Sequence, residues 1–304
     1  MTKPDSGPSE GRSVGRCRRR RAGLGLLAAL LLSGCAQVPA AAPPPSAPAT
    51  ATTSPATTPA STPEASPAPP SATAVRDQSS ESAQPLAGRT IVVDPGHNGK
   101  YSRTFNTKKV PAGNGKKKAC NSSGTAGKGL AEHAYTWAQA KLLKAELERL
   151  GATVLLTRKN DSGLGPCVNQ RAKVANDAEA DLLISLHADG SHARKARGFH
   201  VIISTAMAGG KELEKRSKTL AGHAREALEK HTGMPRSTYI GRGTALSPRR
   251  DIATLNLLRT TPGIMMELGN MRHSADLKLL KSKEFRNQVA TALAEAAVKT
   301  LNPG

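Results

Sequence analysis

The chain has 304 residues, of which 38% are hydrophobic and only 2% aromatic, and its formal net charge is +21. A field of that sign attracts anionic partners, but a nucleic-acid binder would normally interleave aromatic stacking platforms with its basic side chains. With one Trp, three Tyr and three Phe in the whole chain, we expect no nucleic-acid partner, whereas acidic polymers and anionic lipid both fit the charge.

Residues 1–34 have the parts of an export signal peptide. A basic cluster at residues 16–21 precedes an apolar run from Leu24 to Leu32, which is too short to span about 30 Å of hydrocarbon as a helix. Leu32-Ser33-Gly34-Cys35 follows and resembles the bacterial lipobox, in which cleavage leaves a lipid-bearing cysteine. We therefore expect an exported protein, anchored by lipid on Cys35 to the outer face of the cytoplasmic membrane. The alternative is an ordinary cleavage nearby with Cys35 incidental, and both Sec and twin-arginine export stay open.

The next segment, from Ala36 to Pro85, consists largely of Ala, Pro, Ser and Thr. Such a segment has too few large apolar side chains to offset the entropy of folding. We expect residues 35–87 to form a disordered tether. The alternative, a passive spacer without special reach, differs little from this. The folded domain is expected to occupy residues 88–304.

From residue 88 onward, short β-branched runs alternate with longer helical patterns, which is typical of an α/β domain. Apolar runs predict strands at residues 91–93, 154–156, 182–186, 199–203 and 264–266. Apolar residues at helical spacing predict helices at residues 130–150, 168–178, 211–231 and 276–300. We expect a single open, largely parallel twisted sheet with helices on both faces.

The chain has four cysteines. Cys17 would be removed with the signal peptide and Cys35 would carry lipid, which leaves Cys120 and Cys167. Outside the cytoplasm such a pair is more often a disulfide than two free thiols. The bridge would stabilise the fold by about 4 kcal/mol in the chain-entropy model, less any strain.

Polar side chains stand where predicted strands end and helices begin, at the sheet edge where ligands bind in open α/β folds. His97 follows the first strand, Glu132 lies in the first turn of the long helix, and His187 follows the strand at residues 182–186. Two imidazoles and one carboxylate form a three-ligand catalytic zinc set that leaves a fourth position free. Each residue also has a simpler explanation, as a histidine of the sheet rim or as an acid favoured by the helix dipole. The adjacent His133 could replace Glu132 as a ligand.

A further carboxylate, Glu267, ends the strand at residues 264–266 at the same predicted edge. Zinc acidifies a bound water, and a carboxylate that passes the proton to the leaving amine completes a hydrolase. We therefore expect a zinc site at the carboxyl edge of the strands, with His97, Glu132 and His187 as ligands and Glu267 as the catalytic residue.

With these motifs the chain resembles the zinc-dependent N-acetylmuramoyl-L-alanine amidases of the bacterial cell wall, from about Arg89 to Leu301. The resemblance implies hydrolysis of the bond between N-acetylmuramic acid and L-alanine, with the same three zinc ligands and Glu267 as the catalytic glutamate. It also implies peptidoglycan or its muropeptide fragments as the partner, and we expect a monomer. The segments that carry it are Val92–His97, Gly129–Glu132, Leu150–Val154, Thr157-Arg158, Arg171, Asn176, Ala180-Asp181, Ile184–Asp189 and Pro262–Gly269.

The chain departs from the family at two places. Asn270 and His273 stand after Glu267-Leu268-Gly269, where the family commonly has an aromatic residue and, three positions later, an Asn. The rim that faces the substrate therefore departs from the family pattern. Residues 98–127 form a lysine-rich, insertion-like stretch, which is either a flap over the cleft held by Cys120 or a solvated loop.

Three other features carry weaker expectations. His192 and His200 follow His187 closely, but we expect them at the surface or behind the ligands. Arg forks in Arg242–Asn256 could bind stem-peptide carboxylates, although a solvated loop is slightly favoured there.

Two further functions stay open, a zinc peptidase that cuts within the stem peptide and a non-catalytic peptidoglycan-binding lipoprotein. The presence of all four polar residues of the site disfavours the binding module.

Overall fold

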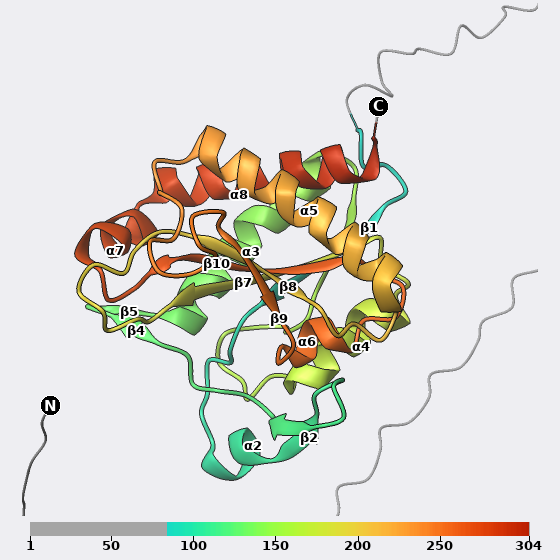
Figure 1. The fold of residues 1–304 in the computed structure, drawn as a ribbon, viewed down its shortest axis with the longest axis horizontal. Helices are drawn as coiled ribbons and strands as arrows, with labels where there is room; N and C mark the ends of the chain where they lie inside the picture. Colours follow the sequence, from blue (N-terminus) through green and yellow to red (C-terminus); the bar gives the residue numbers. More distant parts are fainter. Residues whose placement is uncertain (1–83, 304) are drawn as a thin grey trace, which may run out of the picture. The chain divides into compact units, whose positions relative to one another are not determined.

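The computed structural model describes residues 84–303 (Figure 1). The predicted export signal, Cys35 and the tether as far as residue 83 lie outside the described residues. Between residues 84 and 303, no helix combines the length and the apolar character needed to cross a membrane.

A six-stranded sheet forms the centre of the domain, in the order β6-β1-β7-β10-β8-β9 (Figure 1). Neighbours among β6, β1, β7 and β10 run parallel, whereas β8 is antiparallel to β10 and β9 is parallel to β8. The largely parallel sheet predicted from the sequence is therefore confirmed. The strands are β1 (Thr90–Pro95), β6 (Thr153–Leu156), β7 (Leu182–Asp189), β8 (His200–Ser204), β9 (Leu246–Arg249) and β10 (Gly263–Asn270).

Helices cover both faces of the sheet, as expected (Figure 1). One face carries α3 (Glu132–Arg149), α5 (Gly210–His231) and α8 (Lys283–Leu301), and the other carries α4 (Val168–Asp177) and α6 (Ala253–Asn256). Successive side chains of β1 point to opposite faces, so Ile91 and Val93 enter the larger core cluster and Val92 enters the smaller one. Burial on both faces explains why these strands are continuous apolar runs.

The predicted closing helix at residues 276–300 is wrong as a single element. The structure has two helices, α7 (Ser274–Lys281) and α8, separated at Ser282. Ser282 adopts an extended conformation, and its hydroxyl accepts a hydrogen bond from the amide of Phe285 as the N-cap of α8. An N-cap serine satisfies an amide that would otherwise lack a helical partner, so this residue begins a new helix although the apolar spacing continues across it.

The solvated loop that was slightly favoured for Arg242–Asn256 is also wrong over part of its length. Leu246–Arg249 forms β9, the edge strand beside β8, and Ala253–Asn256 forms α6. β9 contains Pro248 and has no β-branched residue. Proline cannot donate a hydrogen bond to the ladder and is tolerated on edge strands, which is why no strand was predicted here from the sequence.

The insertion-like stretch of residues 98–127 contains α2 (Arg103–Thr107), β2 (Lys109–Pro111), β3 (Lys117–Ala119) and β4 (Ala126–Gly127). β2 and β3 pair as an antiparallel hairpin, and β4 pairs with β5 (Leu130–Ala131). A disulfide joins Cys120 to Cys167, the residue before α4. The amide of Val168 also donates to the carbonyl of Cys120 at 2.8 Å, so the end of the hairpin is attached to the start of α4.

Candidate active site

Three side chains meet where β1 and β7 end and α3 begins. Nε2 of His97 lies 2.9 Å from Oε1 of Glu132, and Nδ1 of His187 lies 3.0 Å from the same oxygen and 3.1 Å from His97 Nε2. These are two imidazole nitrogens and one carboxylate oxygen, each able to act as a ligand atom for one ion. The donor set suits a three-ligand catalytic zinc centre.

The turn after β1 brings the two imidazoles together. His97 has a positive φ of 61°, a strained conformation for a residue with a side chain. Gly96 precedes it, and a Cβ atom there would lie 2.3 Å from Cε1 of His187. Only glycine therefore lets the main chain approach the His187 ring so closely.

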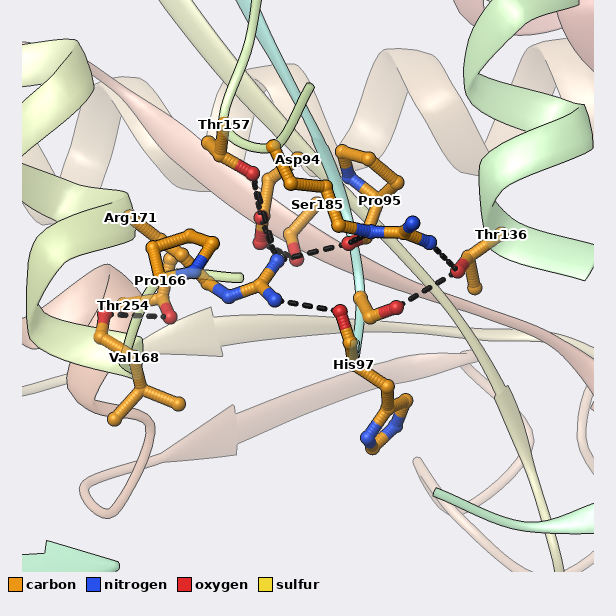
Figure 2. A network of polar contacts seen from close by, with 12 residues as sticks. Asp94, Pro95, His97, Thr136, Thr157, Pro166, Val168, Arg171, Ser185 and Thr254 are labelled. Atoms are coloured by element: carbon orange, nitrogen blue, oxygen red, sulfur yellow. Dashed lines mark hydrogen bonds and ion pairs between the residues drawn. The ribbon is translucent and has the colours of Figure 1, made fainter. Parts of the chain in front are cut away.

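Arg171 of α4 supports this turn through hydrogen bonds to its main chain (Figure 2). Its guanidinium donates to the carbonyl oxygens of Pro95 at 2.8 Å and His97 at 2.6 Å, and to Oδ1 of Asp94 at 2.5 Å. The side chains of Arg171 and Asp94 are almost completely buried. An arginine fork of this kind fixes the geometry of the groups it binds, so the position of the His97 main chain depends on Arg171.

Asp94 is the centre of the buried network (Figure 2). Besides Arg171, it accepts hydrogen bonds from the hydroxyls of Thr157 at 2.5 Å and Ser185 at 2.6 Å. Burial acts to raise the pKa of Asp94. The positive charge of Arg171 and the hydrogen bonds from Ser185 and Thr157 outweigh burial, so the pKa of Asp94 is lowered. Asp94 is therefore a stable anion that balances the buried guanidinium.

The segment from Ser122 to Thr125 orients two of the candidate ligands. The carbonyl oxygen of Ser122 lies 3.0 Å from Nδ1 of His97. Because a carbonyl can only accept, Nδ1 carries the proton and Nε2 offers its lone pair to the cluster. The amide of Thr125 donates to Oε2 of Glu132 at 2.8 Å, which leaves Oε1 facing the two imidazoles.

Burial and charge set the protonation states of the cluster. Burial acts to raise the pKa of Glu132, but hydrogen bonds and positive charge from His187 and His97 outweigh it and lower the pKa of that carboxyl. Burial lowers the pKa of His187, although Glu132 opposes this shift. A neutral imidazole and an ionised carboxylate are the forms that bind a metal ion.

Glu267 approaches the cluster from the neighbouring strand. It is the register partner of His187 in the β10–β7 ladder. Its Oε2 is shielded from solvent and has no hydrogen-bond partner within residues 84–303. Burial raises the pKa of Glu267 well above its ordinary value, and the charges of Glu132 and Asp189 raise it further. Such a carboxyl is suited to proton transfer near neutral pH.

A cavity of about 510 Å³ opens over the cluster, and its lining includes all four of these side chains. Lys118 and Arg249 contribute positive charge to its wall. Nζ of Lys118 donates to the carbonyl of Asp251 at 2.9 Å, and Arg249 forms two hydrogen bonds to the Asp251 carboxylate. The insertion forms part of the cavity wall. Four of its residues line the cavity: Lys118, Asn121, Ser122 and Thr125.

Other histidines that the sequence offered lie apart from the cluster. Nδ1 of His133 lies 2.9 Å from Oδ1 of Asp161, and His133 is not among the residues whose ligand atoms converge. His192 is exposed in a loop. His200 is buried beside Glu267, as its register partner on β8, and burial lowers the pKa of His200 to about 4.

Sequence reasoning missed the part played by Ser122 and Thr125. Thr125 contacts Glu132 through its main-chain amide, and Ser122 contacts His97 through its main-chain carbonyl as well as its hydroxyl. Main-chain groups are the same in every residue type, so no motif marks these contacts. It also missed Tyr239, whose hydroxyl donates to Asp189 at 2.6 Å. Tyr239 stands in a loop without a recognisable pattern.

Comparisons with known proteins agree with this geometry. The model of the family described as N-acetylmuramoyl-L-alanine amidase matches residues 91–299, a range that contains all four polar residues of the site. A Mycobacterium tuberculosis protein named N-acetylmuramoyl-L-alanine amidase is 39% identical over 228 residues, which cover 73% of this chain and 90% of the relative.

Solved structures give the same result. The N-acetylmuramyl-L-alanine amidase of Mycobacterium smegmatis has 38% identity and a TM-score of 0.68, with 72% of this chain and 99% of that one covered. The apo enzyme of Mycobacterium abscessus has 36% identity and a TM-score of 0.67, with 71% of this chain and 100% of that one covered.

Proposed function

The chain belongs to the N-acetylmuramoyl-L-alanine amidase family, and from this premise we propose that it cleaves peptidoglycan as a zinc enzyme with Glu267 as its catalytic residue. The zinc ligands in this proposal are His97, Glu132 and His187. The observation that carries it is the convergence of three ligand atoms, each within 3.1 Å of the next, beneath an open cavity. Close contacts of this kind between one carboxylate and two imidazoles fit an ion that they share.

When bound, zinc supplies Lewis acidity to the amide carbonyl and lowers the pKa of water. The chain supplies the proton transfer. Glu267 accepts the proton of the attacking water and delivers it to the nitrogen of L-alanine as the bond from that nitrogen to the lactyl carbonyl carbon breaks. The raised pKa of Glu267 favours the second of these steps, since a carboxyl that holds its proton is a better acid catalyst at neutral pH.

The location of the enzyme is also part of the proposal. The predicted signal peptide and lipobox would place the domain outside the cytoplasmic membrane on a tether, with peptidoglycan or its fragments as substrate. Radiolabelled palmitate incorporation that is lost in Cys35→Ala would support the anchor. A wild-type chain that takes up no label would contradict it.

Digestion of purified muropeptides, followed by mass analysis, tests the reaction. An amidase releases a lactyl sugar without peptide and a free stem with an N-terminal alanine. A peptidase would instead shorten the stem, and a binding module would leave the muropeptides intact. Removal of the metal with a chelator should stop the reaction, and addition of zinc should restore it.

A further inference from the structure

A second cavity, of about 410 Å³, lies beside the catalytic one. Thr125 lines both cavities, and it is the only residue they share within residues 84–303. Ser122 lines the catalytic cavity, whereas Ser123 and Gly124 line the second cavity. The segment that orients the candidate zinc ligands is therefore also the partition between the two spaces.

An exposed aromatic ring marks the second cavity. Tyr101 is 57% exposed and lines this space. Within the described residues the other exposed large apolar side chain is Leu155, at 37%. The loop that carries Tyr101 is held close to the domain body. The amide of Lys100 donates to the carbonyl of Gly163 at 3.0 Å, and Gly99 packs so closely that a Cβ atom there would overlap the carbonyl of Asp161.

Groups that can donate and accept hydrogen bonds line the same cavity as the Tyr101 ring. Asp161 fixes Nδ1 of His133, so Nε2 is the nitrogen left to serve the cavity that His133 lines. Asn106 also lines the cavity, is only 2% exposed, and has no hydrogen-bond partner for Nδ2 within residues 84–303. The charged side chains of this lining, Lys100 and Arg272, are exposed at its rim.

We propose that this second cavity is a saccharide subsite, which binds the neutral amino-sugar side of the substrate while the stem peptide occupies the catalytic cavity. The inference rests on the proposed function. A pyranose ring presents a face of C–H groups that packs on an aromatic ring, and its hydroxyl and acetamido groups bond to amides and imidazoles. The muramoyl sugar of an intact substrate is uncharged, because its lactyl carboxyl group forms the scissile amide.

The stem peptide has free carboxylates, and it suits the cavity whose wall includes Lys118 and Arg249. The scissile amide would then lie at Thr125, where the substrate passes from one cavity to the other. Both halves of the substrate are recognised in this arrangement, and the amide that joins them lies next to Glu132, which Thr125 contacts.

Calorimetric titration of the full chain with chitotetraose tests the subsite without any hydrolysis. This probe is neutral and has neither a lactyl group nor a peptide, so its binding needs no metal. We expect the wild type to bind it, Tyr101→Phe to bind it equally well, and Tyr101→Ala to lose about tenfold in affinity, the scale of one aromatic contact. Leu155→Ala removes the other exposed apolar side chain and should change nothing. No binding by the wild type, or equal binding by Tyr101→Ala, would overturn the proposal.

Hydrolysis separates this inference from the function on which it rests. Tyr101→Ala should raise KM for a disaccharide peptide about tenfold and leave the rate on a lactoyl peptide without sugar unchanged. If the wild type cleaves no muropeptide but binds chitotetraose through Tyr101, the proposed function fails and the subsite stands. Equal KM changes on both substrates would show that Tyr101 does not contact sugar.

Discussion

The main-chain carbonyl oxygen of Ser122 lies 3.0 Å from Nδ1 of His97. This contact joins the insertion to the three candidate zinc ligands, because it fixes which nitrogen of His97 faces Glu132 and His187. Partners of this kind behind a ligand typically change metal affinity by about 10- to 100-fold when they are lost. Because a main-chain atom of Ser122 makes this contact, a substitution that changes the main-chain conformation of the segment tests it best. Gly124, two residues later, is the position for such a substitution.

Gly124→Ala is predicted to weaken zinc binding by about 10- to 100-fold. Gly124 has a φ of +77°, and a Cβ atom there would lie 2.9 Å from both Oε2 of Glu132 and Cγ of His97. Gly115→Ala is the matched control, because Gly115 has a φ of +76° in the same insertion and nothing within 4 Å of the added atom. Competition with a chromogenic chelator measures the affinity. Equal affinities in the two variants would show that the segment does not position the ligands.

Removal of a candidate ligand is predicted to abolish zinc retention. His97→Ala or His187→Ala leaves two of three protein ligands, which is an incomplete site. Glu132→Ala should behave in the same way, whereas His133→Ala should keep the metal, since the His133 imidazole contacts Asp161 and is not among the converging ligand groups. Metal analysis after dialysis decides between them. Stoichiometric zinc in the first three variants, or its loss from His133→Ala alone, would contradict the ligand set.

The sequence could place the four polar residues at one edge of the sheet. His97 follows β1 and Glu132 begins α3, whereas His187 and Glu267 lie in the carboxyl-terminal halves of β7 and β10. In a parallel sheet such positions share one edge, so the sequence pattern alone brings them together. The central strands were predictable because burial on both faces leaves continuous apolar runs in the sequence. Ser282 and Pro248 show the limit: a single N-cap serine divides α7 from α8, and an edge strand needs no apolar run.

Glu267→Ala is predicted to keep the fold and the zinc but to lose about 10²- to 10⁴-fold in turnover. The reason is that Glu267 stands beside the cluster and is assigned to proton transfer, not to coordination. Glu212→Ala removes an exposed glutamate of α5 and should leave turnover unchanged. Turnover number and zinc content are measured on the same samples. Loss of zinc, or near-normal turnover, would refute the role of Glu267.

Arg171→Leu is predicted to lower the free energy of unfolding by about 3–5 kcal/mol, because it leaves the buried Asp94 carboxylate without its partner. Arg171→Lys should recover only part of this loss, since one ammonium cannot donate along the fork to Pro95, His97 and Asp94 together. Arg216→Leu removes an exposed arginine of α5 and serves as the control. Denaturant unfolding gives the free energies. A loss no larger than that of the control would show that Arg171 does not support the turn.

The disulfide between Cys120 and Cys167 closes a sequence separation of 47 residues. The chain-entropy model gives about 4 kcal/mol of stabilisation for such a loop, so reduction or the double variant Cys120→Ser and Cys167→Ser should lower stability by up to that amount. Asn121 and Ser122 follow Cys120 directly and line the catalytic cavity. Release of the bridge should therefore lower activity. Zinc should stay bound, because none of the zinc ligands is changed.

Thiol titration of the denatured, unreduced protein tests for the bridge directly. We expect no free thiol from Cys120 or Cys167 after export, and a fall in the unfolding midpoint when a reductant is added. The reductant should leave the midpoint of the double variant unchanged, which makes that variant the control for other effects of the reagent. Two free thiols in the exported protein would refute the bridge. Unchanged activity after reduction would show that the insertion keeps its position at the cavity without it.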